Sequence, residues 1–233
     1  VRQFLGVLGL ALPISLLLYA FLTNTALEPS ISDFYHTPMG DVLVGVLCAI
    51  GVFLLTYKGY EPDADEWITD RRVSVAAGLG AIGVAVFPVF PQPAKVCPPP
   101  EFSDMLDYFC PNTGFTQHPN FMHFGSAGLF FACLALFCLV LFPKAQKKNM
   151  TKIEGANIKI YKTCGYLILL SLALLVGTFL GVRFGGPDIQ DKILDWKLIF
   201  WFEVLGVVAF AISWLTKGKT IGSIKSKIQA RAT

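Results

Sequence analysis

Long apolar runs separated by polar segments set the pattern of this chain. Six such runs occupy Gln3–Leu22, Asp41–Tyr57, Val73–Phe90, Phe121–Phe142, Thr163–Val182 and Trp196–Leu215. A helix needs about 20 residues to cross the roughly 30 Å of hydrocarbon in a bilayer, and each run is close to that length. The pattern therefore predicts an all-α, polytopic membrane protein. We expect six transmembrane helices in one bundle over residues 1–216, and a basic tail over residues 217–233.

The composition agrees with a membrane protein. The chain is 54% hydrophobic and 15% charged, with a mean hydropathy of +0.59, whereas about a quarter of the residues are charged in an ordinary soluble domain. The first run follows Arg2, which is also the pattern of a signal peptide. Its length and the lack of a clear cleavage site after it favour a retained transmembrane helix.

The basic residues predict the orientation. Of the 19 lysines and arginines, all but Lys95, Arg183, Lys192 and Lys197 fall on the side of the N-terminus if the six runs alternate in direction. Because basic residues accumulate in cytoplasmic loops, we expect both termini in the cytoplasm of a cell whose plasma or inner membrane holds the protein. The formal charge of +3 then reflects topology and contact with anionic membrane lipids, and it gives no reason to expect nucleic acid as a partner.

The six cysteines divide into two groups. Cys97 and Cys110 lie in the long loop Pro91–Pro119 on the predicted outer side, where oxidising conditions allow a disulfide between them. The remaining cysteines lie in or beside the apolar runs and are expected to be small core residues; they are Cys48, Cys133, Cys138 and Cys164.

A polar segment, Pro29–Asp41, lies between the first two runs and is the main candidate for function. It carries Ser32, Asp33, His36 and Asp41. Ionisable groups at a membrane boundary can face a lipid head group, an ion or a proton path. These residues, together with His123, are the candidate catalytic groups.

All three histidines fall on the predicted outer side. His36, His118 and His123 could bind a divalent metal such as zinc, since neutral imidazole is a common zinc ligand. His118 and His123 are five residues apart and so do not share a helical face. The alternative is a histidine that orders the loops through hydrogen bonds.

Serines in the polar segment allow two interpretations. Ser32 and His36 could form a nucleophile and its base, although such pairs are recognised by geometry rather than by sequence spacing. Alternatively, Ser30 or Ser32 caps a backbone turn, and Asp41 caps the second helix.

One carboxylate, Glu203, lies inside the last apolar run. It is about seven residues, or roughly 10 Å, below the outer boundary. There it must be paired, protonated or facing a polar cavity. Its expected partners are His123, His36 or Arg183, and a buried structural hydrogen bond is the alternative to a functional role.

Glycines in two runs predict close helix packing. Gly78, Gly80 and Gly83 give the third run a face of small residues, and Gly177 and Gly181 form a G-x-x-x-G pattern in the fifth. Small residues let the backbones of membrane helices approach.

Four groups of short motifs follow one another along roughly residues 22–142. They are Pro29-Ser-Ile-Ser-Asp33, Tyr57-Lys58, Gly78-Leu-Gly-Ala-Ile-Gly83 with Val86-Phe87, and His123-Phe-Gly-Ser-Ala127 with Phe130-Phe131. In their order and placement these motifs resemble the Frag1/DRAM/Sfk1 family of six-helix membrane proteins. The resemblance implies a six-helix bundle with cytoplasmic termini and a role in lipid-anchor remodelling, phosphoinositide regulation or autophagy. It also implies that Ser32, Asp33 and His123 are the characteristic polar residues. The cysteine loop and the run from His118 to His123 depart from the family pattern.

Three functions fit these observations. The first is a lipid-handling or lipid-remodelling protein whose outward-facing polar site uses His36, His123, Asp33 and Asp41, with Glu203 below. The second is a non-enzymatic accessory or scaffold subunit that binds another membrane protein. The third is a small transporter in which Glu203 is the coupling group, although the chain lacks evident inverted repeats. No glycine-rich phosphate loop, dinucleotide fingerprint or haem motif occurs in the sequence, which argues against soluble cofactors.

Overall fold

The chain is built from helices. A computed structural model describes residues 2–60, 66–89, 120–147 and 154–218, and these residues contain no strand. The elements are α1 (Arg2–Thr23), the 3₁₀ helix η1 (Ser32–His36), α2 (Gly40–Thr56), α3 (Asp70–Val86), α5 (Phe121–Leu136), the π-helical turn η3 (Phe137–Leu141), α6 (Phe142–Lys147), α7 (Glu154–Phe184), α8 (Pro187–Asp195) and α9 (Leu198–Lys217). The predicted all-helical class is confirmed.

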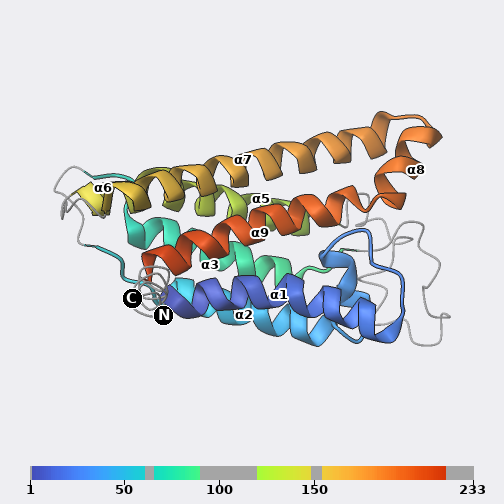
Figure 1. The fold of residues 1–233 in the computed structure, drawn as a ribbon, viewed down its shortest axis with the longest axis horizontal. Helices are drawn as coiled ribbons and strands as arrows, with labels where there is room; N and C mark the ends of the chain where they lie inside the picture. Colours follow the sequence, from blue (N-terminus) through green and yellow to red (C-terminus); the bar gives the residue numbers. More distant parts are fainter. Residues whose placement is uncertain (1, 61–65, 90–119, 148–153, 219–233) are drawn as a thin grey trace, which may run out of the picture.

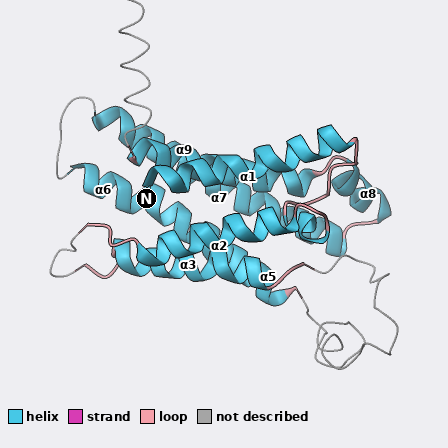
Figure 2. Ribbon diagram, turned by 90° about the horizontal axis from the view of Figure 1, so that it is seen from below, coloured by secondary structure: helices cyan, strands magenta, loops and turns pink. Residues whose placement is uncertain are grey.

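The long helices lie side by side along the long axis of the molecule, and α8 lies across one end (Figure 1). Each long helix packs against two others, in the order α1, α2, α3, α5, α7, α9 and back to α1. Figure 2 shows the same bundle from below. The chain thus closes a ring of helices, in which the first and last helices are neighbours.

Four helical stretches are long and apolar enough to cross a membrane. They are Arg2–Thr23, Phe121–Ala145, Asn157–Val182 and Leu198–Lys217. Helix α2 is apolar but has only 17 residues, and α3 has the same length with a more polar sequence. The structure thus supports a membrane protein, while membrane crossing by α2 and α3 stays a prediction.

Several boundaries differ from those that the sequence predicted. Helix α3 begins at Asp70, because Thr69 Oγ1 accepts a hydrogen bond from the backbone N–H of Arg72 (3.2 Å), and it ends at Val86 rather than Phe90. The segment between the last two apolar runs was expected to be loop, yet it contains α8, with Pro187 in its first turn. Proline is favoured there because the first helical N–H groups have no partner within the helix.

Small residues bring α3 close to both of its neighbours. A Cβ added at Gly78 would lie 2.9 Å from the carbonyl oxygen of Gly51 in α2, and one added at Gly80 would lie 2.9 Å from the backbone nitrogen of Phe130 in α5. The predicted small-residue face of α3 is confirmed. The prediction that the G-x-x-x-G pattern of α7 contacts another long helix is wrong. A Cβ added at Gly177 would meet no described residue of another element within 4 Å, and one added at Gly181 would meet Ile193 of α8.

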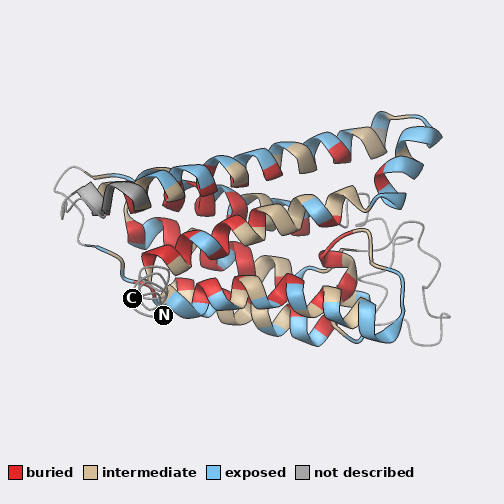
Figure 3. Ribbon diagram, viewed as in Figure 1, coloured by how far each residue is buried: buried red, intermediate tan, exposed pale blue. Residues whose placement is uncertain are grey.

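Buried residues lie mainly on the inner faces of the helices and exposed residues on the outer faces (Figure 3), and many of the exposed residues are large and apolar. The core includes an aromatic group in which Trp214, in the last turn of α9, packs edge-on against Phe137 and Phe142 at 5.4 and 5.2 Å between ring centroids. The outward apolar surface is typical of helices that face lipid.

The two ends of the bundle differ. The start of α1 lies beside the end of α9, where Gln3 Nε2 donates a hydrogen bond to the carbonyl oxygen of Gly218 (3.1 Å). We call this the terminal end. The opposite end holds η1, the end of α3, the start of α5 and α8 (Figure 1). The polar segment Pro29–Asp41 and His123 therefore lie at the same end, as the sequence predicted.

Candidate functional site

The polar segment after α1 is fixed to the bundle by both apolar and backbone contacts. Ile31 and Phe34 are buried, and the ring of Phe34 lies 6.1 Å from that of Phe200 in α9. The backbone N–H of Phe200 donates to the carbonyl oxygen of Pro29 (2.9 Å). These contacts hold the segment against the first turn of α9, which brings its serines to Glu203.

Glu203 accepts hydrogen bonds from this segment. Ser30 Oγ lies 3.0 and 2.9 Å from its two carboxylate oxygens, and the backbone N–H of Ile31 donates to Oε2 at 2.6 Å. The described partners are thus Ser30 and Ile31 instead of the predicted His123 or His36, and the side chain of Arg183 lies outside the described residues. The structural hydrogen bond that was the alternative prediction is observed.

Ser30 also organises its own turn. Its Oγ accepts a hydrogen bond from the backbone N–H of Ser32 (3.0 Å), which confirms the predicted serine cap of a backbone turn. Since the same hydroxyl donates to Glu203, one oxygen connects the carboxylate of α9 to the backbone of Ser32. Glu203 therefore influences where Ser32 lies.

Ser32 and His123 form the central contact. Ser32 Oγ lies 3.0 Å from His123 Nε2, and both residues are buried. His123 Nδ1 lies 2.7 Å from the carbonyl oxygen of Phe87 at the end of α3. A carbonyl can only accept, so Nδ1 carries the proton, and Nε2 of the neutral ring accepts from the Ser32 hydroxyl.

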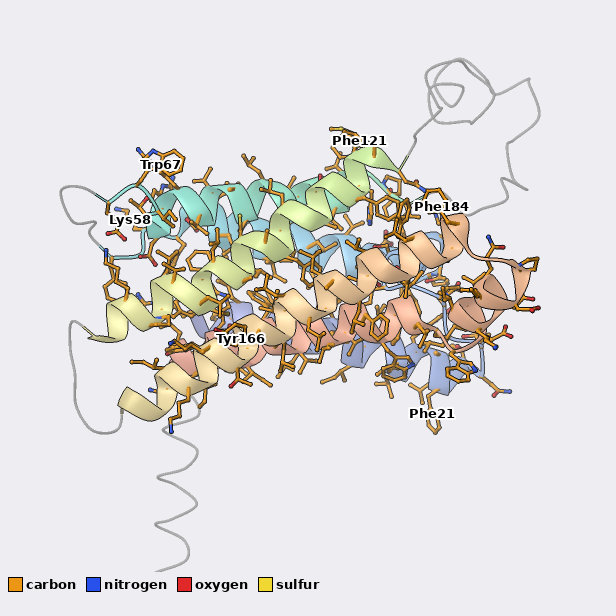
Figure 4. All side chains as sticks on the ribbon, turned by 90° about the horizontal axis from the view of Figure 1, so that it is seen from above. Phe21, Lys58, Trp67, Phe121, Tyr166 and Phe184 are labelled. Atoms are coloured by element: carbon orange, nitrogen blue, oxygen red, sulfur yellow. The ribbon has the colours of Figure 1, made fainter. Side chains whose placement is uncertain are left out.

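The contact has the elements of nucleophilic chemistry. A hydroxyl faces a base, and a third group orients that base, which is the arrangement that activates serine in hydrolases. We refer to Ser30, Ser32, His123 and Glu203 together as the Ser–His–Glu site. Its residues come from the segment after α1, from α5 and from α9, and the Phe87 carbonyl comes from the end of α3. Phe121, labelled in Figure 4, marks this end of α5.

Other predicted site residues lie outside this hydrogen-bond network. His36 is exposed, and its Nε2 is 2.7 Å from the carbonyl oxygen of Val89, so the base beside Ser32 is His123 and not His36. Asp41 is exposed in the first turn of α2 and makes no capping hydrogen bond, because the N-cap residue is Met39. The predicted Asp41 cap is wrong.

Asp33 is half-buried beside the site. The pKa of its carboxyl is raised to about 6, mainly by burial and in smaller part by Glu28, while His36 and Lys197 act in the opposite direction. Loss of water disfavours the charged form of a carboxyl group. Asp33 therefore changes charge near neutral pH, next to Ser32.

The described residues do not assemble the predicted zinc site. No group of three His, Cys, Asp or Glu side chains within them is placed to hold a metal ion. His123 uses both ring nitrogens in hydrogen bonds, so it would lose one of them on binding a metal. His118, Cys97 and Cys110 lie outside the described residues, and the predicted disulfide and the contribution of His118 stay predictions.

Two functional groups were missed by the sequence reasoning. The Phe87 carbonyl carries no signal in the sequence, because every residue has a backbone carbonyl. Ser30 was expected only to cap a turn, and its contact with Glu203 joins residues 173 positions apart. The resemblance did name Ser32 and His123, although not as partners.

Comparison with known proteins identifies no relative of this chain. No protein-family model, no curated protein and no solved structure matches this chain. The interpretation of the site therefore depends on its geometry.

Proposed function

We propose that this chain is an integral membrane protein that remodels lipid esters, with Ser32 as nucleophile and His123 as general base. The observation that carries the proposal is the 3.0 Å contact between Ser32 Oγ and His123 Nε2, with Nδ1 held by the Phe87 carbonyl at 2.7 Å. Distances in this range allow direct proton transfer from the hydroxyl to the ring.

The reaction is acyl transfer. Ser32 Oγ attacks the carbonyl carbon of the ester while its proton moves to His123 Nε2. The tetrahedral intermediate then expels the alcohol, which takes that proton, so that an acyl-serine and a free alcohol result. Water or an acceptor alcohol attacks the acyl-serine in the second step, with His123 again acting as base and then as acid. Water gives hydrolysis, and an acceptor alcohol gives remodelling.

Glu203 is a positioning residue in this proposal. It contacts Ser30 and the Ile31 N–H rather than Ser32, so it acts by fixing the turn from which the Ser32 hydroxyl projects. The substrate class follows from the surroundings of His123. Phe121, Met122 and Phe124 flank it in sequence and are exposed apolar side chains, which suit an acyl chain that enters from the hydrocarbon.

The proposed topology has six membrane-crossing helices, cytoplasmic termini and the Ser–His–Glu site at the outer boundary. It is supported by the closed ring of helices and by basic residues such as Arg71, Arg72 and Lys144 at the terminal end. The resemblance to the Frag1/DRAM/Sfk1 family is compatible with a lipid role, and it depends only on the motifs quoted above.

The decisive experiment uses a fluorophosphonate probe, which reacts with serines that are activated by a neighbouring base. We expect the purified protein in lipid nanodiscs to be labelled at Ser32, as identified by mass spectrometry of the modified peptide. Ser32→Ala should abolish labelling, and His123→Ala should slow it by about 100-fold or more, which is the usual contribution of a general base. Hydrolysis of a fluorogenic long-chain ester should fall in parallel.

Ser15→Ala is the matched control. Ser15 is a half-buried serine in α1 whose hydroxyl donates to the Leu12 carbonyl (2.8 Å), and within the described part of the chain it makes no hydrogen bond to a histidine. Its substitution should leave labelling unchanged. The wild-type sample must first show a cooperative thermal transition, which establishes that it is folded. If that sample is not labelled, or if Ser32→Ala is labelled equally, the proposal fails. A non-enzymatic accessory subunit then becomes the better interpretation.

A further inference from the structure

A second polar group is buried at the terminal end, far along the helices from the Ser–His–Glu site. Two cations meet there, Arg2 from the start of α1 and Lys217 from the end of α9. The Arg2 guanidinium carbon lies 5.2 Å from the centroid of the Tyr60 ring, and Lys217 Nζ lies 4.8 Å from the same centroid. One aromatic ring thus contacts two positive charges.

The rings around Lys217 enclose its ammonium group. Besides Tyr60, Nζ lies 5.1 Å from the Phe142 centroid and 5.8 Å from the Tyr161 centroid. Lys217 is only 6% exposed. Cation–π contacts offset part of the loss of hydration, but a buried ammonium group still favours a nearby anion. We call Arg2, Lys217, Tyr57, Tyr60, Phe142 and Tyr161 the basic aromatic cluster.

The described residues supply little negative charge to this cluster. The ion pair between Lys144 and Glu66, at 2.8 Å, does not involve either cation. Asp70 is buried and interacts electrostatically with both Lys217 and Arg2. Gly59, with φ of +70°, folds the loop over Asp70 so closely that a Cβ there would collide with its side chain. One carboxylate faces two cations.

Polar atoms without partners lie in the same region. Trp214 Nε1 and Asp70 Oδ1 are buried and make no hydrogen bond to the described residues, and the buried Tyr57 hydroxyl has only the Arg2 guanidinium beside it. Tyr57 is in contact with both the Arg2 guanidinium, 5.6 Å from its ring centroid, and the Trp214 ring at 5.3 Å. Buried polar atoms in native proteins nearly always have a partner, so a partner beyond the described residues is expected here.

We propose that the basic aromatic cluster binds the phosphate of an anionic phospholipid. The cluster is at the end of the membrane-spanning helices α1 and α9, which is the depth of lipid head groups. Arg2 and Lys217 supply the charge, and the Tyr57 hydroxyl supplies a further donor. Tyr60 is 38% exposed, so its ring is the part of the cluster that a lipid head group can contact from outside.

The test measures binding of short-chain lipids to the full chain in a neutral detergent. Dioctanoyl phosphatidylglycerol is the anionic probe, and dioctanoyl phosphatidylcholine carries the same phosphodiester with a compensating cation. Inorganic phosphate is the third probe. We expect phosphatidylglycerol to bind with a lower Kd than phosphatidylcholine or inorganic phosphate, as measured by isothermal titration calorimetry. Arg2→Gln and Lys217→Met should each weaken it at least about tenfold, as expected for loss of a charge-assisted hydrogen bond.

Lys58→Gln is the matched control, because Lys58 is an exposed cation at the same end (Figure 4). It should change the Kd less than twofold. Asp70→Asn should tighten binding by removing the competing carboxylate, a gain that misfolding does not produce. Lys217→Arg keeps the positive charge. If Lys217→Met weakens binding because the charge is lost, Lys217→Arg should bind phosphatidylglycerol with nearly the wild-type Kd.

Three results would overturn the proposal. Equal binding of phosphatidylcholine means that charge does not select the lipid. Equal binding of inorganic phosphate identifies a soluble anion as the ligand. An effect of Lys58→Gln as large as that of Arg2→Gln means that only the general surface potential is being measured.

Discussion

The Ser30 hydroxyl donates a hydrogen bond to the Glu203 carboxylate at 2.9 Å, and so connects the segment after α1 to the second turn of α9. Phe200 strengthens the same connection, because its N–H binds the Pro29 carbonyl at 2.9 Å. Two helices at opposite ends of the sequence therefore share a polar junction as well as an apolar interface. The junction holds the turn that presents Ser32 to His123.

Removal of the Glu203 carboxylate should destabilise the fold. Glu203→Ala leaves the Ile31 N–H and the Ser30 hydroxyl without their acceptor, and unpaired donors that are partly buried cost about 1–3 kcal/mol each. We expect a clear fall in Tm in detergent. Glu203→Gln retains one acceptor oxygen and should lose less. An unchanged Tm for Glu203→Ala would mean that water replaces the carboxylate without penalty.

Asp33 should make stability depend on pH. Its pKa is raised in the folded protein from 3.8 to about 6, so the folded state prefers the protonated form. The resulting stabilisation is fully present below about pH 4 and is lost as the pH rises through about 6. Asp33→Asn should therefore raise Tm at pH 7.5, by an amount equivalent to at most about 3 kcal/mol. The advantage should vanish at pH 4, and an equal gain at both values would contradict the role of ionisation.

Ser32 and His123 should be energetically coupled. Each single alanine variant leaves the other side chain without its partner at 3.0 Å, whereas the double variant removes both. A double-mutant cycle on unfolding free energies should give a coupling of about 1 kcal/mol. Ser32 with His36 provides the comparison, and that pair should be additive because His36 binds the Val89 carbonyl instead.

Glycine substitutions should separate tight from open helix contacts. Gly80→Ala places a Cβ 2.9 Å from the Phe130 backbone nitrogen and 3.0 Å from the Ser126 carbonyl oxygen, so α3 and α5 must move apart. The expected cost is about 1–3 kcal/mol, as for other overpacked sites. Gly177→Ala meets nothing within 4 Å and should stabilise α7 by up to about 1 kcal/mol, because alanine favours helix more than glycine does. A loss of Tm in both variants would contradict this packing.

The proposed orientation can be tested by thiol labelling. Trp67 precedes α3 at the terminal end and is 82% exposed (Figure 4), whereas Trp196 precedes α9 at the opposite end and is 69% exposed. In sealed vesicles with the outer face exposed, Trp196→Cys should react with a membrane-impermeant maleimide above the wild-type background. Trp67→Cys should react only after permeabilisation. The reverse result would put the Ser–His–Glu site on the cytoplasmic side.

Much of the helical organisation follows from the sequence by itself. A run of about 20 apolar residues has few alternatives to a helix in a membrane, since backbone polar groups must be paired within the segment. That constraint explains why α1 and α9 match their predicted runs closely. The polar segment after α1 was also located correctly, because its serines and aspartates interrupt the apolar pattern. Helix α8 was missed because it is short and its apolar residues are few.

The pairing of the site residues was decided only by tertiary structure. Ser32 and His123 are 91 positions apart, and Ser30 and Glu203 are 173 apart, so no local pattern relates them. Their contacts depend on how α3 packs against α5 and α1 against α9, which in turn depends on glycines such as Gly80 that set the helix spacing. The sequence determined which residues between the apolar runs are polar, and the packing of helices determined which of them form hydrogen bonds with one another.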